Sequence, residues 1–225
     1  RSGSFDENSQ MLKLGRFRFS FSENVFASGF KQELLLEQGR IEISGDKNFK
    51  IIIWFDTDRP VGHIQISSDT SLEINVSYES WRTQERVIPL ERRKTITGFL
   101  GYVDRDVITF PDVIEPAMNS ITFYHRNRND YSLLDLMAKQ QCMEAVRDQL
   151  YDPHKDLTFG GKLFSDSLCF TGLSDGSYAG IEFKSFNFIS AQSISHKFTL
   201  CFHTEQAESV EDWKQKLNHL CSLAL

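Results

Sequence analysis

The sequence has no long hydrophobic run and no excess of positive charge. Its longest uninterrupted apolar stretch, Ile51–Phe55, is five residues long, whereas a membrane-spanning helix needs about 20. The 225 residues include 31 acidic and 25 basic side chains, which gives a net charge of −6 at pH 7. We therefore expect no membrane segment and no surface that binds nucleic acid or anionic lipid.

Cysteine is scarce and does not form a metal-binding pattern. The four cysteines include no C-x-x-C pair, and no cysteine and histidine lie at the spacing of a zinc site. Cys169 and Cys201 fall in apolar strand patterns, where a free thiol behaves as a small hydrophobic side chain. The sequence thus predicts no metal and no cofactor, and it favours buried free thiols, with a disulfide as the alternative.

The motifs of several enzyme classes are also missing. There is no glycine-rich phosphate loop, no dinucleotide-binding G-x-G-x-x-G and no G-x-S-x-G nucleophile elbow. Acidic residues are plentiful, but no motif pairs two of them as the carboxylates of a glycoside hydrolase. Gly160 and Gly161 are expected to form a turn between two strands. The sequence therefore identifies no catalytic residue.

What the sequence does contain is an alternation of apolar and polar residues. Phe17, Phe19 and Phe21 alternate with polar residues, as expected of a half-buried strand. Similar segments recur about every 8–12 residues with turn residues between them, which is typical of an antiparallel sandwich. We expect a mainly β fold of this kind, with residues 82–118 in long loops that contain one short strand near Val107–Phe110.

Two segments switch to helical periodicity. Residues 132–150 place their apolar side chains on one face of a helix, which Pro153 ends. Residues 209–224 form the second predicted helix, with Ser209 as the N-cap and Asp212 three residues later, an acidic variant of the capping box. The sandwich is therefore expected to carry about two α-helices.

Two clusters of polar and aromatic residues follow predicted strands and are the candidate contact residues. Trp81 and Arg82 end one strand, and His125, Arg126 and Asn127 end another. Aromatic rings stack on the apolar faces of sugars, while guanidinium and other fixed donors hydrogen-bond to hydroxyl groups. The clusters therefore indicate carbohydrate contact. The simpler alternative is a polar cluster that pins a loop or faces a neighbouring domain.

Several short motifs, taken in their order and spacing, resemble an uncharacterised family of bacterial domains. They are Asp6–Asn8, Leu12–Arg16, Phe30–Leu34, Trp54–Asp56 with Pro60, Val61 and His63, Glu79–Arg82, Tyr124–Asn127, Thr158–Gly160 and the closing helix around Trp213. Such domains lie at the N-terminal side of secreted or periplasmic proteins similar to glycoside hydrolase family 95, the α-L-fucosidase-type enzymes. The resemblance implies a β-supersandwich, like that of galactose mutarotase, packed against a C-terminal (α/α)6 barrel that carries the catalytic carboxylates.

This resemblance sets expectations for the whole chain. Residues 1–225 should form one β-sandwich domain cut from a longer secreted or periplasmic polypeptide, since the first residue is Arg1 and the sequence has no room for a barrel. The expected function is non-catalytic support of the barrel, with oligosaccharide as a second partner. Two alternatives stay open: a free-standing carbohydrate-binding module, and a mutarotase-like sugar epimerase, which needs a positioned acid and base.

Overall fold

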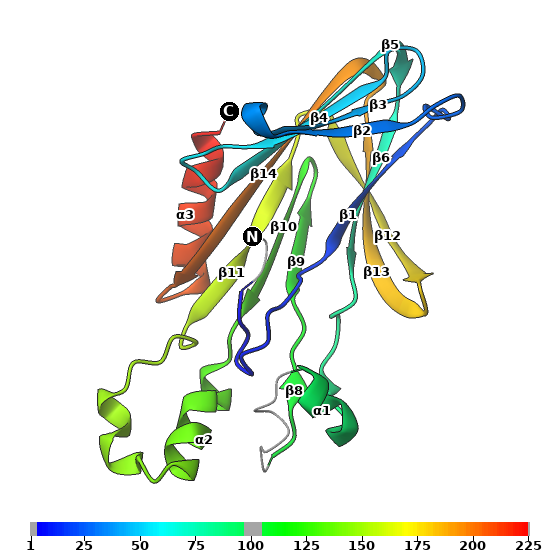
Figure 1. Ribbon diagram of the computed structural model, residues 1–225. Helices are drawn as coiled ribbons and strands as arrows, with labels where there is room; N and C mark the ends of the chain where they lie inside the picture. Colours follow the sequence, from blue (N-terminus) through cyan, green and yellow to red (C-terminus); the bar gives the residue numbers. More distant parts are fainter. Residues whose placement is uncertain (1–3, 97–104, 225) are drawn as a thin grey trace.

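The computed structural model describes residues 4–96 and 105–224, so residues 1–3, 97–104 and 225 of the expected domain lie outside the described part. Within that part the chain is mainly β, with 49% of its residues in strands and 18% in helices. A small and a large antiparallel sheet form a sandwich-like arrangement (Figure 1). The fold class predicted from the alternating sequence is confirmed.

The two sheets differ in size and mix distant parts of the chain. The small sheet has the strand order β1 (Arg16–Phe21), β6 (Ile74–Ser80), β13 (Ile181–Ser190) and β12 (Leu168–Tyr178). The large sheet has the order β2 (Lys31–Leu35), β3 (Arg40–Ser44), β4 (Lys50–Phe55), β5 (Val61–Leu72), β14 (Ser193–Gln206), β11 (Leu157–Phe164), β10 (Ser120–Arg126) and β9 (Val113–Ala117). Each sheet therefore joins strands from both halves of the sequence.

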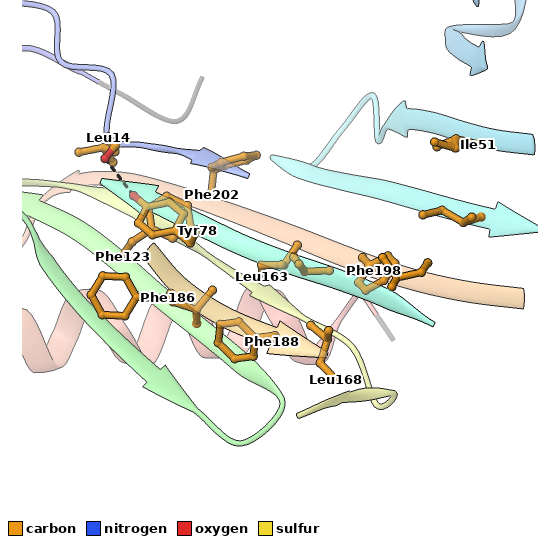
Figure 2. Close-up of a cluster of buried hydrophobic side chains, with 14 of the residues drawn as sticks. Leu14, Ile51, Tyr78, Phe123, Leu163, Leu168, Phe186, Phe188, Phe198 and Phe202 are labelled. Carbon is orange, nitrogen blue, oxygen red and sulfur yellow. Dashed lines mark hydrogen bonds between the residues drawn. The ribbon is translucent and has the colours of Figure 1, made fainter. Parts of the chain in front are cut away.

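The core lies between the sheets and is built from the inward-facing half of each alternating strand. The three phenylalanines of β1 pack against it, as their spacing predicts. Tyr78 of β6 is 1% exposed, and its hydroxyl donates a hydrogen bond to the Leu14 carbonyl oxygen at 3.0 Å (Figure 2). Its ring stacks on Phe123 of the large sheet, with the ring centres 4.7 Å apart. Aromatic contacts thus connect the two layers.

The predicted turn at Gly160 and Gly161 is wrong, because β11 runs through both residues. A Cβ atom on Gly160 would lie 2.1 Å from the Phe123 carbonyl oxygen of β10, and one on Gly161 would lie 2.4 Å from the Cys201 carbonyl oxygen of β14. Both distances are far below van der Waals contact. The two glycines therefore allow β11 to lie close to both of its neighbours, a known reason for glycine inside a strand.

The helix predicted over 132–150 is shorter in the structure. α2 covers Leu133–Gln140, and only two of its eight residues are buried. Cys142, just beyond it, has a φ of 55°, which interrupts a right-handed helix. Packing supplies most of the stability of a helix in a protein, so this weakly buried segment has little to extend it. The rest of the predicted helix contains a short 3-10 helix, η4 (Glu144–Gln149). Two other connections contain similar turns, η1 (Leu36–Gln38) and η3 (Asn129–Tyr131).

The C-terminal helix agrees with the sequence prediction. α3 spans Val210–Ser222, and the Ser209 hydroxyl accepts a hydrogen bond from the Asp212 backbone N–H at 3.1 Å. The helix lies against the outer face of the large sheet beside β14 and β11 (Figure 1). Its buried stripe consists of Trp213, Leu217 and Cys221.

The four cysteines are free thiols, but only two of them are buried, and Cys142 and Cys169 are exposed. Cys201 is fully buried between β14 and α3, next to Cys221, as an apolar strand pattern predicts. Cys169 is exposed, because it points to the face of β12 opposite that of the buried Leu168. The prediction of a buried thiol is therefore right for Cys201 and wrong for Cys169.

Residues 82–118 contain the short strand predicted near Val107–Phe110, and more regular structure than the loops expected around it. The described part of this segment includes a two-stranded ribbon, a short helix and an edge strand of the large sheet: β7 (Arg86–Val87), β8 (Ile108–Thr109), α1 (Leu90–Ile96) and β9. The ribbon and α1 lie at one end of the sandwich (Figure 1). Among the described residues, no helix combines the length and the apolar character that crossing a membrane requires.

Candidate functional site

The predicted contact residues come from one end of the sandwich but do not share one surface. Trp81 and Arg82 follow β6 of the small sheet, whereas His125 and Arg126 end β10 of the large sheet and Asn127 follows it. Successive side chains of a strand point to opposite faces. Within β10, His125 therefore points into the sandwich and Arg126 points away from it, toward the start of α3.

Arg82 and His125 meet in a buried network of charged groups. Arg82 Nη2 donates to Asp112 Oδ2 at 2.6 Å, and the ring of His125 lies between two carboxylates. Its Nδ1 is 3.1 Å from Asp112 Oδ1, and its Nε2 is 3.2 Å from Glu7 Oε2. The side chains of His125, Asp112 and Glu7 are 1%, 0% and 2% exposed. The network thus joins both sheets to the N-terminal segment.

The two carboxylates keep the His125 ring protonated. Burial by itself lowers the pKa of the imidazole, because it disfavours the charged form. Hydrogen bonds and charge attraction from Asp112 and Glu7 outweigh burial and raise the pKa of His125 to about 9. At neutral pH the ring is therefore an imidazolium that donates from both nitrogens. Together with Arg82 it supplies two positive charges opposite the two carboxylates.

The N-terminal segment is held down by further polar contacts. Asp6 accepts hydrogen bonds from the backbone N–H groups of Asn8 and Gln10 at 2.9 and 2.7 Å. Burial is the main reason why the pKa of the Asp6 carboxyl is raised to about 7. Asn127 donates to the carbonyl oxygens of Phe5 and His154 at 3.1 and 3.2 Å. Asn127 thus ties the segment to the end of the large sheet, and only 4% of its surface is exposed.

Arg126 forms a separate cluster on the outer side of the large sheet. Its guanidinium donates to the Thr158 hydroxyl at 2.8 Å, to Asp156 Oδ1 at 2.8 Å and to the Ala207 carbonyl oxygen at 3.1 Å. These partners belong to β11 and to the loops before β11 and before α3. Arg126 therefore connects the sheet to α3, on the face of β10 opposite to His125.

Trp81 is the member of the predicted set that lines an open groove. The groove has a volume of about 690 Å³ and lies between the segment after β6 and the hairpin that joins β12 to β13. Its lining combines two aromatic rings with hydrogen-bond donors and acceptors, and with side chains of positive and of negative charge. The lining residues are Trp81, Thr83, Gln84, Arg86, Asp175, Gly176, Ser177, Glu182, Phe183 and Lys184. The ammonium of Lys13 lies 5.7 Å from the centre of the Trp81 ring.

A second charged cluster supports the strand that carries Trp81. Glu79 of β6 is 2% exposed and pairs with Arg16 and Arg18 of β1, with Arg18 Nε at 2.7 Å. Burial opposes ionisation of Glu79, but the hydrogen bonds from both arginines leave its pKa below the usual value. The Arg16 guanidinium also lies 4.5 Å from the Tyr178 ring centre and 5.6 Å from that of Phe183, which lines the groove.

Sequence reasoning missed the acidic members of the buried network. Glu7 lies 118 residues from His125, and no local pattern indicates that the two meet. Asp112 follows Pro111 in a segment that the sequence predicted as a loop. Among the residues that the structure describes, no group of three or more histidine, cysteine or acidic side chains is arranged to hold a metal ion.

Comparisons with known proteins give the family of the chain. No curated protein matches it. A solved structure of a candidate kojibiose phosphorylase from the human microbiome aligns with a TM-score of 0.43 and 9% sequence identity. The alignment covers 96% of this chain and 26% of the other, so the chain spans about a quarter of that protein. Residues 1–224 match the profile of an N-terminal domain described as a domain of unknown function, DUF5703. The chain therefore belongs to the DUF5703 N-terminal domain family.

Proposed function

We propose that this domain is a non-catalytic part of a bacterial carbohydrate-active protein and that its Trp81 groove contacts the glycan. The observation that carries the proposal is the lining of this groove. It combines two aromatic rings with donors and acceptors within about 690 Å³, a volume inside the range of about 300–1,000 Å³ that is usual for ligand sites.

The charges of the groove favour a neutral, hydroxyl-rich ligand. Arg86 and Lys184 supply positive charges, and Asp175 and Glu182 supply negative ones. Each sugar hydroxyl both donates and accepts hydrogen bonds, so a saccharide uses side chains of both kinds. Because the two positive and two negative charges balance, the groove has no net charge that would favour a phosphate-rich ligand. The half-buried Trp81 ring offers an apolar surface for the C–H face of a sugar.

The buried network has a supporting role in this proposal. The side chains of Arg82, His125 and Asn127 donate hydrogen bonds to partners within the chain, and they fix the strand end that carries Trp81. By the family resemblance, the partner of the domain is a C-terminal (α/α)6 barrel of the same polypeptide, in a secreted or periplasmic protein similar to glycoside hydrolase family 95. Arg126, on the outer side of the large sheet, is a candidate contact for that barrel.

Oligosaccharide binding to the 225-residue chain tests the proposal directly. Trp81→Ala should weaken the binding of an oligosaccharide found in a glycan panel by about tenfold or more, as measured by titration calorimetry. Trp81→Phe keeps an aromatic ring and should retain most of the affinity. Because Trp81 is only half-buried, both variants should unfold close to the wild-type temperature. Equal affinity of wild type and Trp81→Ala would contradict the role of the groove.

The same groove would serve a free-standing carbohydrate-binding module. An antibody against this chain distinguishes the two, because it detects the mass of the native polypeptide in its source cells. A mass several times 26.0 kDa supports the multidomain protein, and a mass near 26.0 kDa supports the module. In the first case, kinetics of the intact protein with Trp81→Ala would show whether the groove handles substrate.

A further inference from the structure

A second cavity lies on the outer face of the large sheet, away from the Trp81 groove. Four side chains stand directly opposite one another on neighbouring strands β4, β5, β14 and β11: Trp54, His63, Thr199 and Phe164. Adjacent strands are about 4.8 Å apart, so the backbones of His63 and Phe164 are about 10 Å apart. Thr199 between them is short, and its position therefore leaves a gap between two rings.

This gap is part of a cavity of about 400 Å³, which we call the slot. Thr199 forms its floor, and the rings of His63 and Phe164 lie on its two sides. Ala224, which follows α3, also lines it. The remaining polar lining comes from β5, β14 and the turn after β11: Gln65, Lys197, Ser165 and Asp166. The volume falls in the range of about 300–1,000 Å³ that is usual for small-molecule sites.

The His63 side of the slot is held in place before any ligand binds. The Trp54 ring stacks on the His63 ring, with centres 4.9 Å apart and planes 19° apart. His63 Nε2 is 3.1 Å from Asp56 Oδ1, and Arg59 donates to the other oxygen of Asp56 at 2.6 Å. Arg59 also donates to the Leu223 carbonyl oxygen at 2.6 Å. A side chain fixed in this way loses little conformational entropy on binding.

We propose that the slot binds a single pyranose ring, as a second glycan contact of the domain. A sugar ring is flat enough to enter between two side chains about 10 Å apart at the backbone, with its C–H faces toward His63 and Phe164. Lys197 donates, Asp166 accepts, and Gln65 does both, so the hydroxyl groups have partners of each kind. One positive and one negative charge give the slot no preference for an ionic ligand. The inference rests on the proposed function for its ligand class, but on different residues.

Filling the slot tests the inference. Thr199→Phe places a ring in the gap, while Ser195→Phe places the same ring on the same face of β14 at an exposed position that does not line the slot. Saturation-transfer NMR with methyl glycosides of the common hexoses and of fucose measures binding to each variant. We expect Thr199→Phe to lose at least about tenfold in affinity and Ser195→Phe to match wild type.

A second variant covers the case in which Thr199→Phe does not fold. Lys197 is exposed at the rim of the slot, so Lys197→Met removes one donor with little effect on the sheet, and it should weaken binding severalfold. Unchanged binding in both variants, or preferential binding of adenosine over every glycoside, would overturn the inference.

The result also separates this inference from the proposed function. Loss of glycan binding in Trp81→Ala alone supports the groove and overturns the slot. Loss in Thr199→Phe alone supports the slot and contradicts the groove. If wild type binds no saccharide at all, both proposals fail.

Discussion

Raising the pH from 7 to 10 should destabilise the fold through His125. In the folded chain the pKa of this imidazole is about 9, against about 6.5 for an unperturbed histidine. Because the folded-state pKa is the higher one, the stabilisation is fully present below pH 6.5 and is lost as the pH rises through 9. The difference between the two values corresponds to about 3 kcal/mol, of which about 2.5 kcal/mol remains at pH 7 and almost none at pH 10.

Asp6, the other group of this region with a strongly raised pKa, acts in a different pH window. Its pKa of about 7 exceeds the usual value of about 3.9, so the unfolded chain releases its proton first and stability falls mainly between pH 4 and pH 7. The interval from pH 7 to pH 10 therefore reports mostly on His125. Cysteine, tyrosine and lysine side chains also titrate between pH 7 and pH 10. Their contribution is measured in a variant that lacks His125 and is subtracted from that of wild type.

Urea unfolding at pH 7 and pH 10 gives the free energy of unfolding for wild type, His125→Gln and His219→Gln. Wild type and the exposed His219→Gln control should both lose the His125 contribution of about 2.5 kcal/mol between these pH values. This loss adds to the background, which is the change in stability caused by the other titrating groups. His125→Gln should lose only the background and should be less stable at pH 7. NMR titration of the ring gives the pKa directly. The same pH dependence in His125→Gln and wild type, or a ring titration midpoint below 7, would refute the reasoning.

Three further substitutions test the packing by unfolding measurements. Gly160→Ala should cost about 3 kcal/mol, because the new methyl group meets the backbone of β10, whereas Gly29→Ala, with open space around its Cβ, should change stability by less than about 1 kcal/mol; equal stability of the two would contradict the close strand approach. Ser209→Ala should lower the free energy of unfolding by about 1 kcal/mol, because it removes the N-cap of α3. Urea unfolding followed by the circular dichroism of the helices would measure this loss. Tyr78→Phe leaves the Leu14 carbonyl without its partner and should cost about 1–2 kcal/mol; wild-type stability would show that the hydrogen bond contributes nothing.

The strands were predictable because burial on one face imposes a period of two on the sequence. The phenylalanines of β1 show this most clearly, since each occupies an inward position. The errors arose where a residue has a role outside that pattern. Gly160 and Gly161 have the composition of a turn, but their role depends on the backbones of β10 and β14, which come from other parts of the chain. The pattern of the sequence around residue 142 does not reveal its left-handed backbone.

The site was predictable in part, because strand ends can be located but their surroundings cannot. The sequence placed Trp81 and His125 at strand ends, and the structure agrees. The alternation that located β10 also requires His125 and Arg126 to point to opposite faces, so the two were never able to share one contact surface. The charge of His125 depends on Glu7 and Asp112, which the fold brings to it from distant segments.

The slot shows why the outer face of a sheet is harder to read than its core. Trp54, His63, Phe164 and Thr199 lie in four separate strands, and their alignment depends on three antiparallel registers. A shift of one residue in any of them would turn a strand's side chains to the other face.

The slot and the Trp81 groove share no residue and lie on different sheets, so the effects of variants in the two sites on binding free energy should add for separate sugars. If one glycan reached both, the second contact would become intramolecular, and losing either site would cost more affinity than that site provides alone. Comparing Trp81→Ala, Thr199→Phe and the double variant on long and short glycans therefore shows whether the domain holds one chain or two.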